Sequence, residues 1–87
     1  MYVILAYDIR VKRVNRVHKT VKQYLRPVQK SVFEGFLSEG EVKQLKAELL
    51  TRIDPEEDSI RIYLFQNYQG ASVEEIGQMP CTDFTIL

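Results

Sequence analysis

Residues 2–9 read YVILAYDI, and this stretch decides the fold. Its residues are β-branched, aromatic or otherwise apolar, and Asp8 is the only polar one. Because both alternating faces of the run are apolar, it predicts a central strand that is covered on both sides. The apolar part, Tyr2 to Tyr7, is far shorter than the ~20 residues that a membrane-spanning helix needs, so we expect no membrane segment.

The pattern of apolar residues changes after this strand. From Arg10 to Arg26 they recur every three or four positions, as in an amphipathic helix that Pro27 ends. Residues 28–37 read as one strand. Ser38-Glu39-Gly40-Glu41 matches a capping box, which predicts a second helix that closes before Pro55. Residues 60–65 alternate as a strand, residues 67–70 carry a turn signal, and residues 84–87 predict a short terminal strand.

This order of elements predicts the fold class. The chain has no repeat, linker or low-complexity segment, so we expect a single domain over residues 1–87. If residues 28–37 bend into a hairpin at Gly35, the order is that of an α+β, ferredoxin-like βαββαβ sandwich with a short C-terminal strand. Two helices on one face of the sheet would leave the other face bare, although the first strand is apolar there too. We therefore predict that a second copy of the chain covers it in a homodimer.

Charge divides the chain into two parts. Residues 1–33 carry eight basic side chains and one acidic side chain, a net of +7, whereas residues 34–87 carry four basic and eleven acidic side chains, a net of −7. The simplest outcome is one basic face and one acidic face. The basic face could attract a polyanion, or the two faces could attract each other in an oligomer.

Asp8 is the first candidate site residue, because it ends a buried strand just before a basic helix. Magnesium favours oxygen ligands, commonly one or two carboxylates together with waters and substrate phosphates. Two copies of Asp8 that meet across a two-fold axis would supply such a pair. The structural alternative is that Asp8 caps the helix or forms an ion pair with Arg10, Lys12 or Arg13.

A row of basic residues along the first predicted helix is the second candidate. Its members are Arg10, Lys12, Arg13, Arg16, Lys19, Lys22, Arg26 and Lys30, and no acid interrupts them. Such a row attracts phosphates through Coulomb forces and counterion release, without reading sequence. The alternative is an ordinary solvated face.

The chain has few of the residues that other catalytic or metal sites require. His18 is the only histidine and Cys81 the only cysteine, so one chain offers no Ser-His-Asp triad, no multi-histidine metal site and no intramolecular disulfide. We expect His18 to pack at the helix border and Cys81 to be inert. Tyr7 and Phe33 lie near strand ends, where bases could stack. The lone cysteine, and a start that lacks a positively charged leader, predict a cytoplasmic protein.

Two segments taken together resemble a known family. Tyr7-Asp8-Ile9 followed by Arg13 and Arg16, and VQKSVFEG at residues 28–35, are similar to the small CRISPR-associated Cas-two proteins. The resemblance covers residues 1–66 in length, order and motif. It implies a ferredoxin-like homodimer whose C-terminal strand, residues 78–87 here, pairs with the partner subunit.

The resemblance also implies a function. Members of the family assemble with the Cas-one integrase to capture foreign DNA and insert it into the CRISPR array, and several are described as magnesium-dependent endonucleases on RNA or DNA. Asp8 would bind Mg²⁺ or Mn²⁺ together with its copy in the partner subunit, and Tyr7, Ser31 and Phe33 would lie beside it in the catalytic cleft. The residues expected to bind nucleic acid are Arg10, Lys12, Arg13, Arg16 and Lys19.

One feature departs from the family pattern. Members often carry acids just after the aspartate, whereas Arg10-Val11-Lys12 stands here and leaves Asp8 as the sole acid. We predict a CRISPR adaptation protein that binds double-stranded DNA, or single-stranded RNA, and cleaves phosphodiesters with a metal ion. One alternative is a non-catalytic DNA-binding scaffold of the integrase complex. Another is a regulatory module for a small ligand, which predicts no affinity for nucleic acid.

Overall fold

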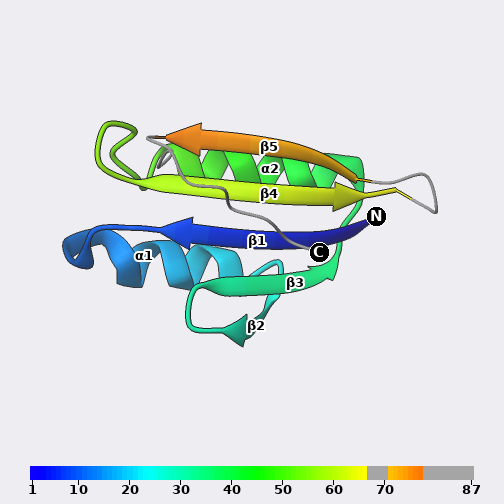
Figure 1. The fold of residues 1–87 in the computed structure, drawn as a ribbon, viewed down its shortest axis with the longest axis horizontal. Coiled ribbons are helices and arrows are strands. Elements are labelled where there is room, and N and C mark those ends of the chain that lie inside the picture. Colours follow the sequence, from blue (N-terminus) through cyan, green and yellow to red (C-terminus); the bar gives the residue numbers. More distant parts are fainter. Residues whose placement is uncertain (67–70, 78–87) are drawn as a thin grey trace.

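The computed structural model describes residues 1–66 and 71–77. Its elements are β1 (Tyr2–Asp8), α1 (Val11–Lys22), β2 (Arg26–Gln29), β3 (Val32–Phe36), α2 (Glu39–Leu50), β4 (Ser59–Phe65) and β5 (Ala71–Gly77) (Figure 1). The strands form one antiparallel sheet in the order β2-β3-β1-β4-β5. The predicted α+β, ferredoxin-like βαββαβ arrangement is confirmed, and β5 extends it at one edge.

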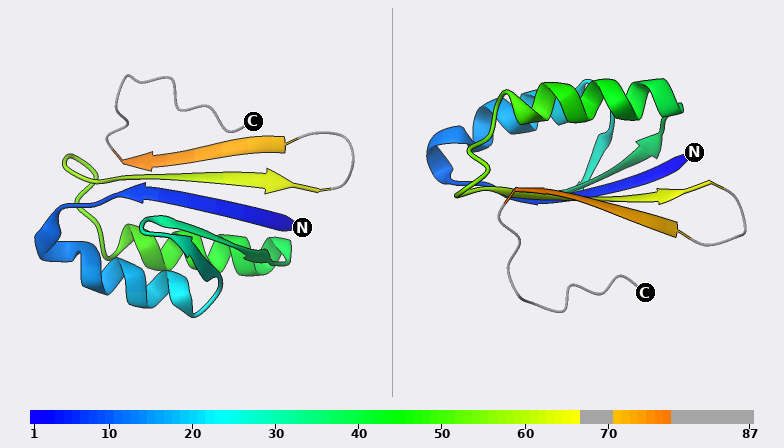
Figure 2. Two further views of the ribbon diagram at one scale, coloured as in Figure 1. Left: turned by 60° about the horizontal axis from the view of Figure 1, so that its bottom comes forward. Right: turned by 90° about the horizontal axis from the view of Figure 1, so that it is seen from above.

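Both helices cover the same face of the sheet (Figure 2). The hydrophobic core lies between the helices and the sheet, and every element except the edge strands β2 and β5 contributes to it. Core side chains that are essentially inaccessible to solvent include Val3 and Leu5 from β1, Val17 from α1, Leu45 from α2 and Ile62 from β4. Burying these side chains supplies most of the stability of a domain this small.

β1 is the central strand, as the sequence predicts. It pairs with β3 over Tyr2–Ala6 and with β4 over Tyr2–Asp8. Successive side chains of a strand point to opposite faces, so Val3 and Leu5 face the helices while Tyr2 and Ile4 face away from them. Asp8 is the last residue of this strand and is paired with Ser59 of β4.

The sheet surface turned away from the helices carries an apolar patch. We call this surface the open face, and its members used below are Tyr2, Ile4, Phe36, Phe65 and Val73. The ring centroid of Tyr2 lies 5.3 Å from that of Phe36 and 5.8 Å from that of Phe65. Phe36 is 79% exposed and Val73 is 47% exposed. Exposed large apolar side chains that lie together in this way are typical of an interaction surface.

The structure corrects two predictions for residues 10–37. α1 ends at Lys22, not at Arg26, because Pro27 disfavours helical geometry at the residue before it and Arg26 already belongs to β2. Residues 28–37 are not one strand: the chain turns at Lys30 and Ser31, between β2 and β3.

The predicted bend at Gly35 is also wrong. Gly35 lies inside β3, opposite Val3 of β1. A Cβ atom at this position would lie 2.9 Å from Cδ2 of Leu25. The glycine therefore allows Leu25 to approach the strand closely, as glycines in strands often do.

The start of the second helix agrees with the prediction. Ser38 is the N-cap of α2; its Oγ accepts a hydrogen bond from the Glu41 amide at 3.2 Å, and the Glu41 carboxylate accepts one from the Ser38 amide at 2.9 Å. The helix ends at Leu50, well before Pro55, although Ile53 beyond it remains buried.

β5 is a strand that the sequence did not predict. Its sequence, ASVEEIG, contains residues that are poor strand formers, and it is held by pairing with β4 along its whole length, from Ala71↔Phe65 to Gly77↔Ser59. The predictions for residues 67–70, 78–87 and Cys81 lie outside the described residues. Among the described residues, no helix combines the length and apolar character that crossing a membrane requires.

Candidate metal site and nucleic-acid interface

Asp8 has an exposed carboxylate at the carboxyl end of the central strand. Within residues 1–66 and 71–77 this carboxylate makes no hydrogen bond and no ion pair. The structural alternative, in which Asp8 caps the following helix or pairs with one of its bases, is therefore wrong for the described residues. The N-cap of α1 is Arg10, which has no side-chain capping bond.

Asp58 takes the structural role that the sequence assigned to Asp8. Asp58 belongs to the loop that joins α2 to β4, and it is completely buried. Its carboxylate accepts hydrogen bonds from the amides of Arg10 at 2.9 Å and Asp54 at 2.8 Å. Its Oδ2 also lies 2.5 Å from Nε of Arg13, and its Oδ1 lies 3.1 Å from a terminal nitrogen of the same guanidinium. Asp58 thus joins the start of α1 to the loop before β4.

The pKa of Asp58 shows how strongly this carboxylate is held. Burial raises the pKa, but the hydrogen bonds from Arg13 and from the two backbone amides outweigh burial and lower the pKa to about 2. The hydrogen bonds with Asp58 and Glu57 raise the pKa of Arg13 in turn. This ion pair is largely removed from solvent, since the Arg13 side chain is 12% exposed.

Arg13 is therefore not placed as a phosphate ligand in this structure. Its guanidinium is committed to Asp58 and also contacts Glu57 at 2.8 Å. The sequence analysis did not single out Asp58 as a site residue. The signal that could have found it is the acidic run at residues 54–58, which lies directly before a buried strand in a chain whose first helix begins with bases.

Other members of the basic row remain available. The side chains of Arg10, Arg16 and Lys19 are exposed and form no ion pair with any described carboxylate. Lys12 lies 3.9 Å from Glu57, in a pair that is largely open to water and therefore weak. Since the first turn of α1 contains no acid, the exposed side of this helix presents net positive charge.

Tyr7 is held between α1 and the β2–β3 turn. Its amide donates to the carbonyl of Ser31 at 3.1 Å, and its Oη lies 3.4 Å from Nδ1 of His18. Burial raises the pKa of Tyr7 above the ordinary value of a phenol. Ser31 is half-buried, and its hydroxyl makes no hydrogen bond within the described part of the chain.

Phe33 does not reach the surface. The structure leaves it completely buried, with its ring centroid 5.8 Å from that of Tyr7 and 5.2 Å from that of His18 in an edge-on contact. Phe33 is therefore not open to a stacking base in the cleft beside Asp8, as the sequence analysis expected, because the helix side of β3 is covered by α1. Its observed role is to support Tyr7 and His18, and the packing expected for His18 is confirmed.

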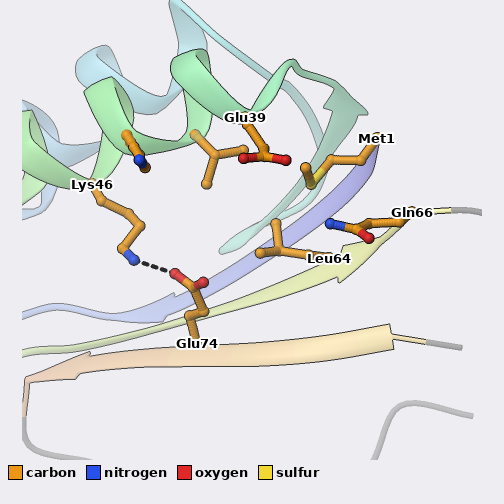
Figure 3. Close-up of a pocket in the computed structure, with 8 residues that line it drawn as sticks. Met1, Glu39, Lys46, Leu64, Gln66 and Glu74 are labelled. Carbon is orange, nitrogen blue, oxygen red and sulfur yellow. Dashed lines mark hydrogen bonds and ion pairs between the residues drawn. The ribbon is translucent and has the colours of Figure 1, made fainter.

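Two cavities lie at opposite ends of β1. A cavity of about 340 Å³ adjoins Tyr7, Asp8, Lys30 and Ser31. Another, of about 250 Å³, adjoins Met1 and lies between α2 and the β4–β5 pair, where Lys46 of α2 reaches across to form an ion pair with Glu74 of β5 (Figure 3). Because β1 separates the two cavities by its length, only the cavity near Asp8 can belong to the candidate site.

Comparisons with known proteins agree with the resemblance in the sequence. The model of the family described as CRISPR associated protein Cas2 matches residues 1–73. A protein of Thermotoga maritima named CRISPR-associated endoribonuclease Cas2 is 43% identical over 77 residues, which is 88% of either chain. A protein of Halalkalibacterium halodurans named CRISPR-associated endonuclease Cas2 is 38% identical over 89 residues, which cover 95% of this chain and 93% of that one.

A solved structure described as a crystal structure of cas2 has the same architecture. It matches with a TM-score of 0.74 and 40% sequence identity, over 100% of this chain and 98% of that chain. The match to the family model includes residues 7–9 and 28–35, the two segments on which the resemblance rests.

Proposed function

Because the chain belongs to the Cas2 family of CRISPR-associated proteins, we propose that it binds nucleic acid in CRISPR adaptation and cleaves phosphodiester bonds with a bound divalent cation. The names of its relatives, endoribonuclease and endonuclease, support the nuclease activity. The observation that carries the proposal is the exposed carboxylate of Asp8, which has no partner among the described residues and lies just before a helix with unpaired cations.

The residues present fit a metal ion that two chains share. The described residues contain no group of three or more histidine, cysteine, aspartate or glutamate side chains that could hold a metal. Within the described residues, Asp8 is the acid that lines the cavity at this end of β1, and a second copy across a two-fold axis would supply another carboxylate. Mg²⁺, or Mn²⁺ in its place, is commonly bound by one or two carboxylates, waters and substrate phosphates.

The side chains around Asp8 have separate tasks in this proposal. A bound divalent cation would activate a water and offset charge on the phosphate. Asp8 would hold that cation, while Arg16 and Lys19, further along α1, bind other phosphates of the nucleic acid. Arg10 and Lys12 add positive potential at the entrance, and Tyr7 and Ser31 border it.

The partners follow from the same surfaces. We propose a homodimer that forms through the open face, with residues 78–87 of one domain pairing with the other subunit. In a dimer the α1 cations of both subunits would form a longer track for double-stranded DNA or single-stranded RNA. We further propose that this dimer works in the cytoplasm with the Cas-one integrase.

Cleavage can be tested by removing the carboxylate alone. Asp8→Ala should lower the rate of RNA or DNA cleavage by at least about 100-fold, because the charge stabilisation that a metal provides is worth several kcal/mol. EDTA should abolish cleavage by the unmodified protein. Glu39→Gln is the matched control, since Glu39 is an exposed acid that lines the cavity beside Met1, at the opposite end of β1, and it should retain full activity. Equal cleavage by Asp8→Ala would indicate a contaminating nuclease and remove the enzymatic proposal.

The second candidate function is a non-catalytic scaffold. It is favoured by the sparse ligand set, one carboxylate per chain, together with an intact row of exposed cations. A scaffold would bind duplex DNA with strong salt dependence and show no EDTA-sensitive cleavage. A regulatory module for a small ligand would show no salt-dependent mobility shift with nucleic acid at all.

A further inference from the structure

The cavity of about 340 Å³ beside Asp8 has a mainly apolar wall. Ile9, Val11 and Val14 form this wall, from the end of β1 and the first turn of α1. Val11 is 88% exposed. An exposed valine at the first position of a cationic helix contributes nothing to the core, so its place at the cavity rim calls for an apolar occupant.

The lining also contains polar groups that are unpaired among the described residues, namely those of Asp8, Lys30 and Ser31. Lys30 is exposed and forms no ion pair with a described carboxylate, and the half-buried Ser31 hydroxyl has no hydrogen-bond partner in residues 1–66 and 71–77. Tyr7 contributes an aromatic side chain whose position is set by Phe33 and His18. The cavity thus combines apolar and aromatic surface with a hydroxyl, a carboxylate and a cation that have no partner within residues 1–66 and 71–77.

We propose that this cavity is a subsite for one unpaired nucleobase of a single-stranded RNA, whose adjoining phosphate pairs with Lys30. The volume lies near the lower end of the roughly 300–1,000 Å³ that small-ligand pockets occupy. A base presents a flat apolar face to the valines and a polar edge to Ser31, as in other proteins that bind single strands. Asp8 borders the same cavity, so the bound nucleotide lies next to the residue proposed to hold the metal.

A base subsite of this kind distinguishes single-stranded from double-stranded nucleic acid. Bases in a duplex are paired and stacked, and a cavity bounded by a helix and a turn can receive one only after it leaves the stack. Phosphates of a duplex and of a single strand, in contrast, are equivalent for the exposed cations of α1. This inference rests on the proposed function, and it assigns the substrate preference to Val11, Val14 and Ser31.

The test separates the base from the phosphates. Binding of a fluorescein-labelled single-stranded RNA, and of its duplex, is measured by anisotropy in EDTA so that no cleavage occurs. Val11→Ser should weaken binding of the single strand by about threefold to tenfold and leave duplex binding unchanged, since an aliphatic contact with a base contributes less than the stacking on an aromatic side chain, which is worth about 1–3 kcal/mol. Val28→Ser is the matched control, because Val28 is an exposed valine outside this cavity.

An abasic scan makes the test sharper. The same RNA is prepared with one abasic site at each position in turn. At one position the loss of the base should weaken binding to the unmodified protein about as much as Val11→Ser does, and Val11→Ser should not respond further. A flat scan, or an equal effect of Val11→Ser on duplex, overturns the base subsite while nucleic-acid binding stands. Absence of binding to either form overturns the proposed function as well.

Discussion

Asp8 and Asp58 are neighbours in the fold with opposite environments. Asp8 pairs in register with Ser59, the residue after Asp58, yet its carboxylate is exposed and uncommitted, whereas that of Asp58 is buried and fully hydrogen-bonded. Asp58 forms the ion pair with Arg13 and accepts the hydrogen bond of the Arg10 amide, so neither interaction requires Asp8. This division of labour between the two acids supports the assignment of Asp8 to metal binding.

The buried ion pair predicts a large effect on stability. Asp58→Ala should lower the free energy of unfolding by about 3–5 kcal/mol, because it leaves the guanidinium of Arg13 largely buried without its partner. Glu57→Ala, which removes the exposed partner of the same arginine, should cost less than about 1 kcal/mol. Urea denaturation followed by circular dichroism measures both, and equal losses would contradict the special role of Asp58.

The lowered pKa of Asp58 predicts acid sensitivity. Its pKa is about 2 in the folded protein and about 3.9 in an unfolded chain. Between these values the unfolded state binds more protons, so the stability that Asp58 contributes is present above about pH 5 and is lost as the pH falls toward 2. Asp58→Asn should flatten this part of the curve of unfolding free energy against pH. A curve as steep as that of the unmodified protein would show that other carboxylates cause the acid sensitivity.

At the scale of the element, α1 carries charges that do not serve its own stability. Arg10 and Lys12 lie at its amino-terminal end, where the helix dipole disfavours cations, and the first turn contains no acid. The helix is held by burial of Val17 and Val21 and by the contacts of Asp58. Cations retained at an unfavourable position support a role in binding phosphates.

Neutralising α1 should change the salt dependence of binding. Arg16→Ala and Lys19→Ala should each reduce the slope of log K against log salt for duplex DNA by about 1, because each removes one phosphate contact. Lys43→Ala is the control, since Lys43 is an exposed lysine on α2. Anisotropy titrations at a series of salt concentrations measure these slopes. An equal reduction with Lys43→Ala would show that DNA binding depends on the total charge of the protein and not on phosphate contacts of α1.

At the scale of the whole molecule, the open face is the main feature that one chain leaves unexplained. Helices cover one side of the sheet only (Figure 2). On the other side Phe36 is exposed next to Tyr2, whose ring also contacts Phe65, and Val73 is exposed on the edge strand β5. A second copy seated on this face would bury the apolar patch. It would also provide the second Asp8 that the proposed metal site requires.

Charging the open face should separate the subunits. Phe36→Asp should give a monomer in size-exclusion chromatography with light scattering, because a buried charge without a partner opposes association. The change should also abolish cleavage, while Asp8 itself stays intact. Leu50→Asp is the control, since Leu50 is an exposed leucine on α2, in the helical layer. If Phe36→Asp remains dimeric, the subunits associate through another surface.

Much of the fold could be predicted from local patterns. The apolar run of β1, the capping box of α2 and the helix-ending effect of Pro27 act through residues close in the chain, so the central strand and the start of α2 were found correctly. The predicted bend of the hairpin was placed at Gly35 instead of at Lys30 and Ser31, and the strand β5 was not predicted, because pairing with β1 and β4 stabilises these strands more than their own composition does.

The candidate site, like the fold, was predicted from the sequence only in part. The sequence alone determined that Asp8 ends the central strand, that a row of bases follows it, and that the family motifs surround it. Only the tertiary structure decided that Arg13 is committed to Asp58, that Phe33 is buried, and that a cavity opens beside Asp8. The reason is physical: strand and helix patterns depend on neighbouring residues, whereas ion pairs, burial and cavities depend on residues that the fold brings together from distant parts of the chain, such as Arg13 and Asp58, which are 45 positions apart.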